Sequence, residues 1–412
     1  MLSEGSAAAQ PVPGWLRQRL RAAHGSVPFA TFMDWALHDP LEGAYGSGRL
    51  TIGPRGDFAT SPSLGPDFAA LLLQQVAGWL QQLGPGPLTL IETGPGEGTL
   101  ALELANGLVE GWPDLACRTA LLLVEPNAGM AERQRRLLAH ARLAVRWWHP
   151  DQPCVPEPRA VVLAHEVLDA LPVERIVWDG QSWCQQRVVL QELPDGPPSL
   201  ALAAGDRLGP EALARLRHGA EAADDPGLWM GDRPAGWCTE LHPALEGWMQ
   251  RCAALVQHGW LLVIDYALEA RRYYAPSRSD GTLMAYRRQT ASANPLQEPG
   301  HWDLTAHLCL ETLERAALGA GWQPRGHCRQ GTALLALGLA GRLHGLQAAG
   351  AGDLAERLAR REALLRLVDP AALGEFRWWA GCRGSACATG GHPLFLCEPP
   401  RDPPVESACG QD

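Results

Sequence analysis

The chain has 412 residues, enough for one large domain with insertions or two ordinary domains, and 46% of them are hydrophobic, so a substantial core can form. Its formal net charge of -10 disfavours a general nucleic-acid-binding protein. We expect no membrane insertion and a cytoplasmic location, because no apolar run reaches the ~18 residues that span a bilayer and the N-terminus does not have the pattern of a secretory signal.

Residues 14–82 are expected to be mainly helical, with a Gly- and Pro-rich loop over residues 39–66. After them, apolar runs typical of buried strands alternate with helical segments. The expected strands are 88–92, 119–125, 143–147, 160–165 and 260–265, and the first helices between them are 99–107 and 128–141. Near-continuous apolar strands followed by helices predict an α/β fold with a doubly wound, mostly parallel sheet covered on both faces.

The interval between the fourth and fifth strands is too long for one crossover, so we expect an insertion over residues 171–255. Its first part predicts a hairpin that turns at Asp179–Gly180, and its later part, around 209–227, predicts helix and loop. Beyond the fifth strand, the patterns predict a helix at 304–319, a strand pair at 322–327 and 332–339, and a helix at 353–367.

These elements divide the chain into three parts. Residues 1–87 form a helical N-terminal segment, residues 88–340 form the domain with the sheet and its insertion, and residues 341–412 form a C-terminal extension. The end of the extension is rich in Pro, Gly and Cys, a composition that favours disorder.

A glycine cluster follows the first strand, in the stretch ETGPGEGT. Gly94, Gly96 and Gly98 occupy every second position, where they let the backbone turn tightly and approach a ligand closely. The helix that begins at Thr99 offers free N–H groups to a carboxylate or a phosphate. A dinucleotide fingerprint would place a third glycine where this sequence has Thr99, so a nicotinamide cofactor is disfavoured.

Two acidic residues narrow the ligand further. Glu92 lies before the first glycine, where it would repel a pyrophosphate but can pair with an ammonium group. Glu125 ends the second strand, where a carboxylate can accept both hydroxyls of a ribose. S-adenosylmethionine (AdoMet) carries an ammonium, a carboxylate and a ribose but no phosphate, so we predict AdoMet. The alternatives are a structural glycine turn and, for Glu125, a solvated residue at a helix start.

Polar residues also follow the third and fourth strands. Asp151 can accept a hydrogen bond from the adenine amino group, although an ordinary polar turn explains it equally well. In AHEVLDALP, Glu166 and Asp169 can grip a guanidinium or take the proton that it loses on methylation, and His165 is an alternative base. The structural alternative is that Asp169 caps the next helix beside Glu166.

The cysteine and tryptophan residues give less information about function than these motifs do. The 11 cysteines are scattered and include no C-x-x-C pair, which suits a reducing compartment. Cys382 and Cys387 are the closest pair, with His392 nearby, but a zinc site there would need two more well-spaced ligands, so free thiols are expected and no metal is predicted. The pair Trp378–Trp379 is expected in the core, with an exposed partner surface as the alternative.

Taken together, the motifs resemble the MidA-type family, the bacterial relatives of the mitochondrial complex I assembly-factor arginine methyltransferase. The resemblance covers residues 30–340. The segments that carry it are MDWALHDPLEGAYGSG (Met33–Gly48), RGDFATSP (Arg55–Pro62), ETGPGEGTL (Glu92–Leu100), VEP (Val124–Pro126), HEVLDALPV (His165–Val173), the Asp265–Tyr266 pair, GTLMAY (Gly281–Tyr286), DLTAHL (Asp303–Leu308) and QGTALLALG (Gln330–Gly338).

The resemblance implies a seven-stranded class I AdoMet-dependent methyltransferase that modifies an arginine of a protein substrate, a subunit of an NADH dehydrogenase of the complex I type, and supports its assembly. It also implies that the RGDF loop lies beside the cofactor, with Asp57, Thr60 and Ser61 as pocket residues; the residues alone predict only a turn with a helix cap. The oligomeric state is left open.

The sequence departs from the family pattern at three positions. His165 replaces the usual Asn, Ala267 replaces a Gly, and Gln289 replaces a His. His165 and Gln289 favour a second hypothesis, an AdoMet-binding assembly chaperone with little catalysis. Turnover after AdoMet binding distinguishes the two hypotheses.

Overall fold

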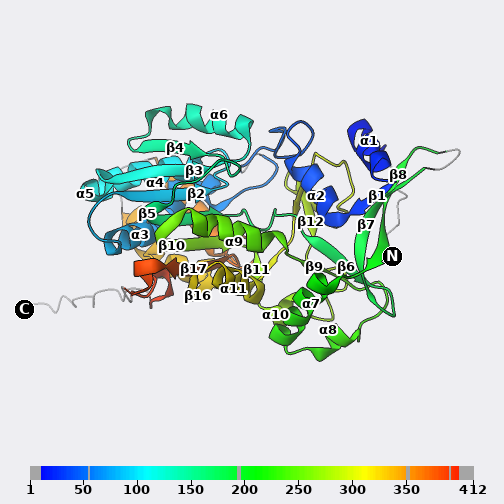
Figure 1. The fold of residues 1–412 in the computed structure, drawn as a ribbon. Helices are drawn as coiled ribbons and strands as arrows, with labels where there is room; N and C mark the ends of the chain where they lie inside the picture. The colour runs from blue at the N-terminus through cyan, green and yellow to red at the C-terminus, as the bar shows by residue number, and fades with distance from the viewer. Residues whose placement is uncertain (1–10, 54–55, 193–195, 349–352, 389–390, 399–412) are drawn as a thin grey trace, which may run out of the picture.

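The centre of the protein is a seven-stranded sheet, seen at the left of Figure 1, in a computed structural model that describes residues 11–53, 56–192, 196–348, 353–388 and 391–398. The strand order is β16-β17-β10-β5-β2-β3-β4. In chain order the strands are β2 (Leu88–Thr93), β3 (Thr119–Val124), β4 (Ala144–Trp148), β5 (Glu157–His165), β10 (Val256–Asp265), β16 (Gln323–Arg329) and β17 (Arg377–Arg383). Only β17 runs antiparallel to its neighbours, which confirms the predicted doubly wound, mostly parallel sheet.

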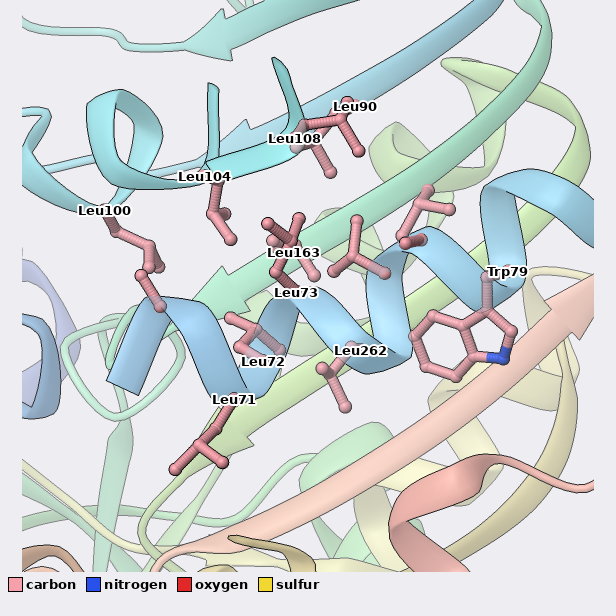
Figure 2. Packing of buried hydrophobic residues seen from close by; sticks show 14 of the residues in the cluster. Leu71, Leu72, Leu73, Trp79, Leu90, Leu100, Leu104, Leu108, Leu163 and Leu262 are labelled. Atoms are coloured by element: carbon pink, nitrogen blue, oxygen red, sulfur yellow. The ribbon is translucent and has the colours of Figure 1, made fainter. Parts of the chain in front are cut away.

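Helices cover both faces of this sheet, as the unbroken apolar strands require. On one face lie α3 (Pro66–Gln82) and α4 (Thr99–Gly111), and on the other lie α9 (Ala244–Ala254) and α11 (Leu310–Gly319). Figure 2 shows the first face, where leucines of α3 and α4 pack against Leu90, Leu163 and Leu262 of three neighbouring strands. The carboxyl ends of β2, β3 and β5 are thereby held in one fixed row, where the loops that follow them meet.

Truncating a side chain in this layer should cost much stability. Leu163→Ala removes a side chain that is 2% exposed in the middle of the sheet, and leaves a cavity that the packed helices cannot fill. We expect the free energy of unfolding to fall by about 2–5 kcal/mol. A lower urea midpoint at unchanged slope would show this. Leu358→Ala, at a side chain that is 55% exposed, is the control and should change it by less than ~0.5 kcal/mol.

A second lobe, at the right of Figure 1, is built from the insertion and the N-terminal segment. Its sheet contains β1 (Ser26–Pro28), β6 (Glu174–Trp178), β7 (Trp183–Gln191), β8 (Ser199–Arg207) and β9 (Cys238–Leu241). The predicted hairpin is confirmed: β6 and β7 pair across a turn in which Asp179 Oδ1 accepts the N–H groups of Gln181 and Ser182.

The helices of this lobe are α7 (Pro210–Ala223) and α8 (Pro226–Met230), together with α1 (Gly14–Ala22) and α2 (Phe29–His38) from the N-terminal segment. The latter two share an apolar core with Ala170 and Val173, just after β5, and with Leu283 and Leu304. The N-terminal segment is therefore fixed directly beside the carboxyl end of β5. Helix α9, inside the expected insertion, packs on the central sheet instead.

Two predictions of secondary structure are wrong. The apolar run at 332–339, predicted as a strand, instead spans most of the helix α12 (Gln330–Ala336) and the turn into α13 (Leu339–Ala348), because a short buried apolar run fits either element. The strand that completes the sheet is β17, which lies beyond the expected boundary at residue 340. The predicted helix at 304–319 begins only at Leu310, since its first residues form β14 (Asp303–Thr305) and β15 (Leu308–Cys309).

The structure of β17 also shows whether the tryptophan pair is buried or exposed. Trp378 and Trp379 are fully buried, one on each face of the sheet, so they form no exposed partner surface. Cys382, in the same strand, accepts a hydrogen bond from Arg325 Nε, and the described residues contain no group of His, Cys, Asp and Glu arranged to hold a metal.

The remaining elements are shorter connections and the C-terminal extension. They are η1 (Ser61–Leu64), α5 (Pro113–Ala116), α6 (Ala128–Leu137), η2 (Leu138–His140), β11 (Ala267–Leu268), α10 (Ala270–Tyr273), β12 (Met284–Arg287), β13 (Thr290–Ser292), α13 (Leu339–Ala348), α14 (Leu354–Val368), η3 (Gly384–Cys387) and η4 (Leu394–Leu396). Disorder is predicted for the end of the C-terminal extension. Of that part of the chain, residues 389–390 and 399–412 lie outside the described residues. None of the described helices is long and apolar enough to cross a membrane.

Candidate active site

A cavity of about 880 Å³ opens at the carboxyl ends of β2, β3 and β5, where ligands bind in doubly wound sheets. The loops that follow these strands supply its centre. One arm reaches α9, and the other reaches α2 and the Gly46 loop. Nine of the 13 predicted site residues line the cavity, whereas Gly98, Asp169, Asp57 and Ser61 do not. The nine are Glu92, Gly94, Gly96, Thr99, Glu125, Asp151, Thr60, His165 and Glu166.

The glycine loop needs glycine for two reasons. Gly94 and Gly96 have φ of 62° and 53°, in the left-handed region that side chains disfavour. A Cβ on Gly94 would also lie 2.8 Å from Cγ2 of Val167. Gly98 precedes α4 and faces Gln134 rather than the cavity. Helix α4 starts without a side-chain cap, so its first N–H groups are free for a ligand carboxylate.

Glu92 is a buried carboxyl on the cavity wall that has an unpaired oxygen. It is 4% exposed, and its Oε2 has no hydrogen-bond partner among the described residues. Burial raises the pKa of this carboxyl to about 8. A buried carboxylate is stable only beside a positive group, so the position fits the ammonium of AdoMet.

The raised pKa of Glu92 predicts a proton release on binding. In the free protein at pH 7 this carboxyl is protonated, and pairing with a ligand ammonium requires it to ionise. We expect calorimetry in buffers of different ionisation enthalpy to find close to one proton released per AdoMet at pH 7, and progressively less as the pH rises through 8. Glu92→Gln should abolish the release and weaken binding. A wild-type release that does not change between pH 6 and pH 9 would contradict this account.

The carboxylate of Glu125 is oriented so that each of its oxygens can accept a hydrogen bond from a ligand diol. Its Oε1 accepts the N–H of Asn127 and its Oε2 accepts Gln134 Nε2, each at 2.8 Å, which leaves a lone pair on each oxygen. The buried Gln134 also donates to Gly96 O at 2.8 Å, so one side chain ties the acidic anchor to the glycine loop. The sequence reasoning missed Gln134, which lies in an ordinary helical pattern.

The arm towards α9 has the character of a site for a planar aromatic base. Asp151 lies on its rim with a largely exposed side chain. Trp148 and Trp248 supply apolar surface, and Trp148 Nε1 is buried with no partner among the described residues. Neither tryptophan was predicted, because only the fold brings α9 to the end of β4.

The RGDF loop reaches the cavity differently from what the resemblance implied. Thr60 lines it, but Asp57 does not: its two oxygens accept the backbone N–H groups of Thr51 and Arg288, on the far side of the loop. The side chain of Ser61 is buried against Gln330. Its backbone N–H instead favours the ionised form of the Glu166 carboxyl and so counteracts the rise in that group's pKa, which means that Ser61 acts on the site through its main chain.

Glu166 lies at the junction of the cavity and a group of buried acids. Its φ is 51°, a strained value for a residue with a side chain, and its Oε1 lies 3.5 Å from Nδ1 of His165. Burial, then the charge of Asp265, holds the pKa of Glu166 well above its usual range. Burial lowers the pKa of His165 to about 3, so the imidazole is neutral.

Asp169 lies behind Glu166 and does not line the cavity. It is not a helix cap, since no helix follows it before β6. Burial raises its pKa well above the usual range, and Asp265, Asp303 and Glu166 add to the shift. None of these four carboxyl groups pairs with an arginine among the described residues.

Two of these acids were not predicted as site residues, although the motifs that contain them were noticed. Asp265 Oδ2 accepts the N–H groups of Val167 and Leu168, so it fixes the loop that carries Glu166. Asp303 accepts the hydroxyl of Tyr45 at 2.9 Å, and burial raises its pKa to about 7. A signal was available in the Asp265–Tyr266 and DLTAHL motifs, but not the contacts.

This fold, with a buried acid facing the glycine loop and a second acid prepared for a ribose, defines an AdoMet-dependent methyltransferase of class I. The sequence matches, over residues 71–328, a family described as "Putative S-adenosyl-L-methionine-dependent methyltransferase". The chain belongs to that family, and it is a methyltransferase whose cofactor is AdoMet.

Relatives and solved structures agree. The chain is 28% identical to a protein of Drosophila melanogaster named "Protein arginine methyltransferase NDUFAF7 homolog, mitochondrial", covering 90% of this chain and 85% of that one. The human protein of the corresponding name is 26% identical, over 89% and 83%. A Burkholderia thailandensis protein described as a "likely methyl transferase", solved with S-adenosyl-homocysteine, matches with TM-score 0.80 and 28% identity, over 95% and 99% of the two chains.

Proposed function

We propose that the protein is a protein arginine N-methyltransferase that modifies a subunit of a respiratory NADH dehydrogenase of the complex I type and supports its assembly. The names of the relatives support the arginine and the protein substrate. The predicted cytoplasmic location stays a prediction.

The observation that carries the arginine assignment is the acidic arm of the cavity. Glu166 lines it, Asp169 and Asp303 lie behind, and no arginine among the described residues neutralises them. Burying carboxyl groups together is costly unless a cation joins them or they keep their protons. A guanidinium supplies a planar cation whose N–H groups match carboxylate oxygens. Asp34, an exposed residue of α2, also lines the cavity and adds a further carboxylate.

These positions suggest how the chain's own residues act. AdoMet, when bound, would supply an electrophilic methyl group; its S–CH3 bond breaks as the methyl is transferred, and S-adenosyl-homocysteine leaves. Glu166 would orient the guanidinium and accept the proton that its nitrogen loses as the new N–C bond forms. Asp265 would hold the Glu166 loop in register through the N–H groups of Val167 and Leu168. The neutral His165, at 3.5 Å, can share that proton with Glu166.

The test is transfer of a labelled methyl group to a real acceptor. NADH dehydrogenase subunits from cells that lack this protein would be incubated with it and with labelled AdoMet, and the product digested and sequenced by mass spectrometry. Label on an arginine of one subunit supports the proposal. Label confined to lysine or to a small molecule overturns the arginine assignment. AdoMet binding without transfer to any acceptor favours the assembly chaperone, in which His165 and Gln289 replace the family's usual residues.

A further inference from the structure

A second hollow, of about 550 Å³, lies on the other side of the loop that walls the cofactor cavity. Within this loop Ile52 and Phe58 line the cofactor cavity, whereas Thr51 and Asp57 line the hollow. One loop of the chain therefore separates the hollow from the cofactor cavity. The volume is within the range of about 300–1,000 Å³ typical of ligand sites.

The hollow is basic although the protein as a whole is acidic. Arg49, Arg287, Arg288 and His301 line it, and Asp57 is the only acid among its lining residues in the described part of the chain. The carboxylate of Asp57 is already engaged, because it accepts the backbone N–H groups of Thr51 at 2.9 Å and Arg288 at 3.1 Å.

The three arginines are not equally available. Arg49 is paired with Glu42 at 2.8 Å and Arg287 is paired with Glu298, in both cases a residue outside the lining of the hollow. No acceptor among the described residues binds the guanidinium of Arg288, which is exposed. Among the three arginines, Arg288 is therefore the one whose guanidinium can receive an anion.

The backbone holds Arg288 there at a cost. Arg288 and Gln289 form the two-residue turn between β12 and β13, with φ of 47° and 61°, where glycine or asparagine is usual. The RGDF loop holds this turn: Gln289 N–H donates to Asp57 O at 2.8 Å, and Gln289 Nε2 donates to Gly56 O at 3.1 Å. Strain that the surroundings impose in this way is typical of ligand-binding positions.

We propose that this hollow binds an acidic side chain of the protein substrate, near in sequence to the arginine that enters the cofactor cavity. The inference rests on the proposed function. Arginine binds a carboxylate through two parallel hydrogen bonds, and the two sites lie on opposite sides of one loop, so one polypeptide can reach both. Gln289, a departure from the family pattern, and Asp57 thus belong to substrate recognition rather than to the cofactor site.

The test compares two synthetic peptides of equal length, one with the acceptor arginine flanked by Asp and Glu and the other by Asn and Gln. Binding is measured by fluorescence anisotropy at fixed salt, in the presence of S-adenosyl-homocysteine, for wild type, Arg288→Ala, Arg288→Glu and the control Arg361→Glu. Arg361 is an exposed arginine of α14 with no partner among the described residues. Affinity for S-adenosyl-homocysteine is measured first on each sample.

We expect wild type and Arg361→Glu to bind the acidic peptide about tenfold more tightly than the neutral peptide. Arg288→Ala should reduce this difference and Arg288→Glu should remove it. The affinity for S-adenosyl-homocysteine should be the same in all four proteins. Equal binding of the two peptides by wild type, or an advantage that persists in Arg288→Glu, would overturn the proposal. Binding of inorganic phosphate more tightly than the acidic peptide would mean a free-anion site instead. Loss of S-adenosyl-homocysteine binding by wild type would be a failure of the proposed function, not of this hollow alone.

Discussion

Replacing Gly96 by valine should nearly abolish AdoMet binding while leaving the protein folded. Gly96 has φ of 53°, and a Cβ there would lie 3.0 Å from Cδ1 of Ile52, inside the cofactor cavity. A β-branched residue would move the backbone towards negative φ, since the left-handed region costs roughly 1–2 kcal/mol. The shift would also displace Gly96 O from Gln134 Nε2, which holds Glu125. We expect the dissociation constant, measured by calorimetry, to rise at least ~100-fold, about 2.8 kcal/mol.

The control must carry the same backbone strain at a position without a ligand. Gly321→Val fulfils this, because Gly321 has φ of 84°, has open space around a Cβ, and lies in the turn between α11 and β16. It should lower the melting temperature by a similar amount and leave AdoMet affinity within about twofold. Tight AdoMet binding by a folded Gly96→Val protein would show that the ligand does not approach this loop.

The sheet and the cofactor anchors could be predicted because each depends on short-range patterns. Buried parallel strands are continuous apolar runs, and a glycine loop between a strand and a helix is a local signal, so Glu92, Gly94 and Glu125 were found without long-range information. The last strand was missed for the opposite reason. The run at 332–339 and the strand β17 are both apolar and short, and only packing against β10 and β16 distinguishes them.

The acidic arm shows where sequence reasoning stops. Glu166 was predicted from its place after a strand, but Asp265 and Asp303 come from segments about 100 and 137 positions further on, and Tyr45 from the N-terminal segment. These residues come together only in the tertiary structure, and their spacing in the sequence does not predict it. Asp57 illustrates the reverse error: its motif placed it beside the cofactor, whereas its hydrogen bonds hold the neighbouring turn.

Glu166→Gln should separate catalysis from cofactor binding. Glutamine has the shape of glutamate, but it cannot take up a proton or balance the charge of a guanidinium. We expect kcat for methyl transfer to fall by about 10²–10⁴-fold, the range for loss of a positioned acid or base. AdoMet affinity should stay within about twofold, because Glu92 and Glu125 are untouched.

The pH dependence of the same reaction gives an independent measure of this role. Burial raises the pKa of Glu166 in the free enzyme, so the carboxylate that receives the guanidinium is scarce at low pH and accumulates as the pH rises. Wild-type kcat/KM should therefore increase with pH until Glu166 ionises, and Glu166→Gln should lose that rise. The matched control is Glu103→Gln on α4, another carboxyl whose pKa burial raises, to about 7, but outside the cavity. It should keep both kcat and the wild-type profile. A Glu166→Gln enzyme with wild-type kcat and the same pH profile would exclude Glu166 as the proton acceptor and favour His165, whose Nδ1 lies 3.5 Å from Glu166 Oε1.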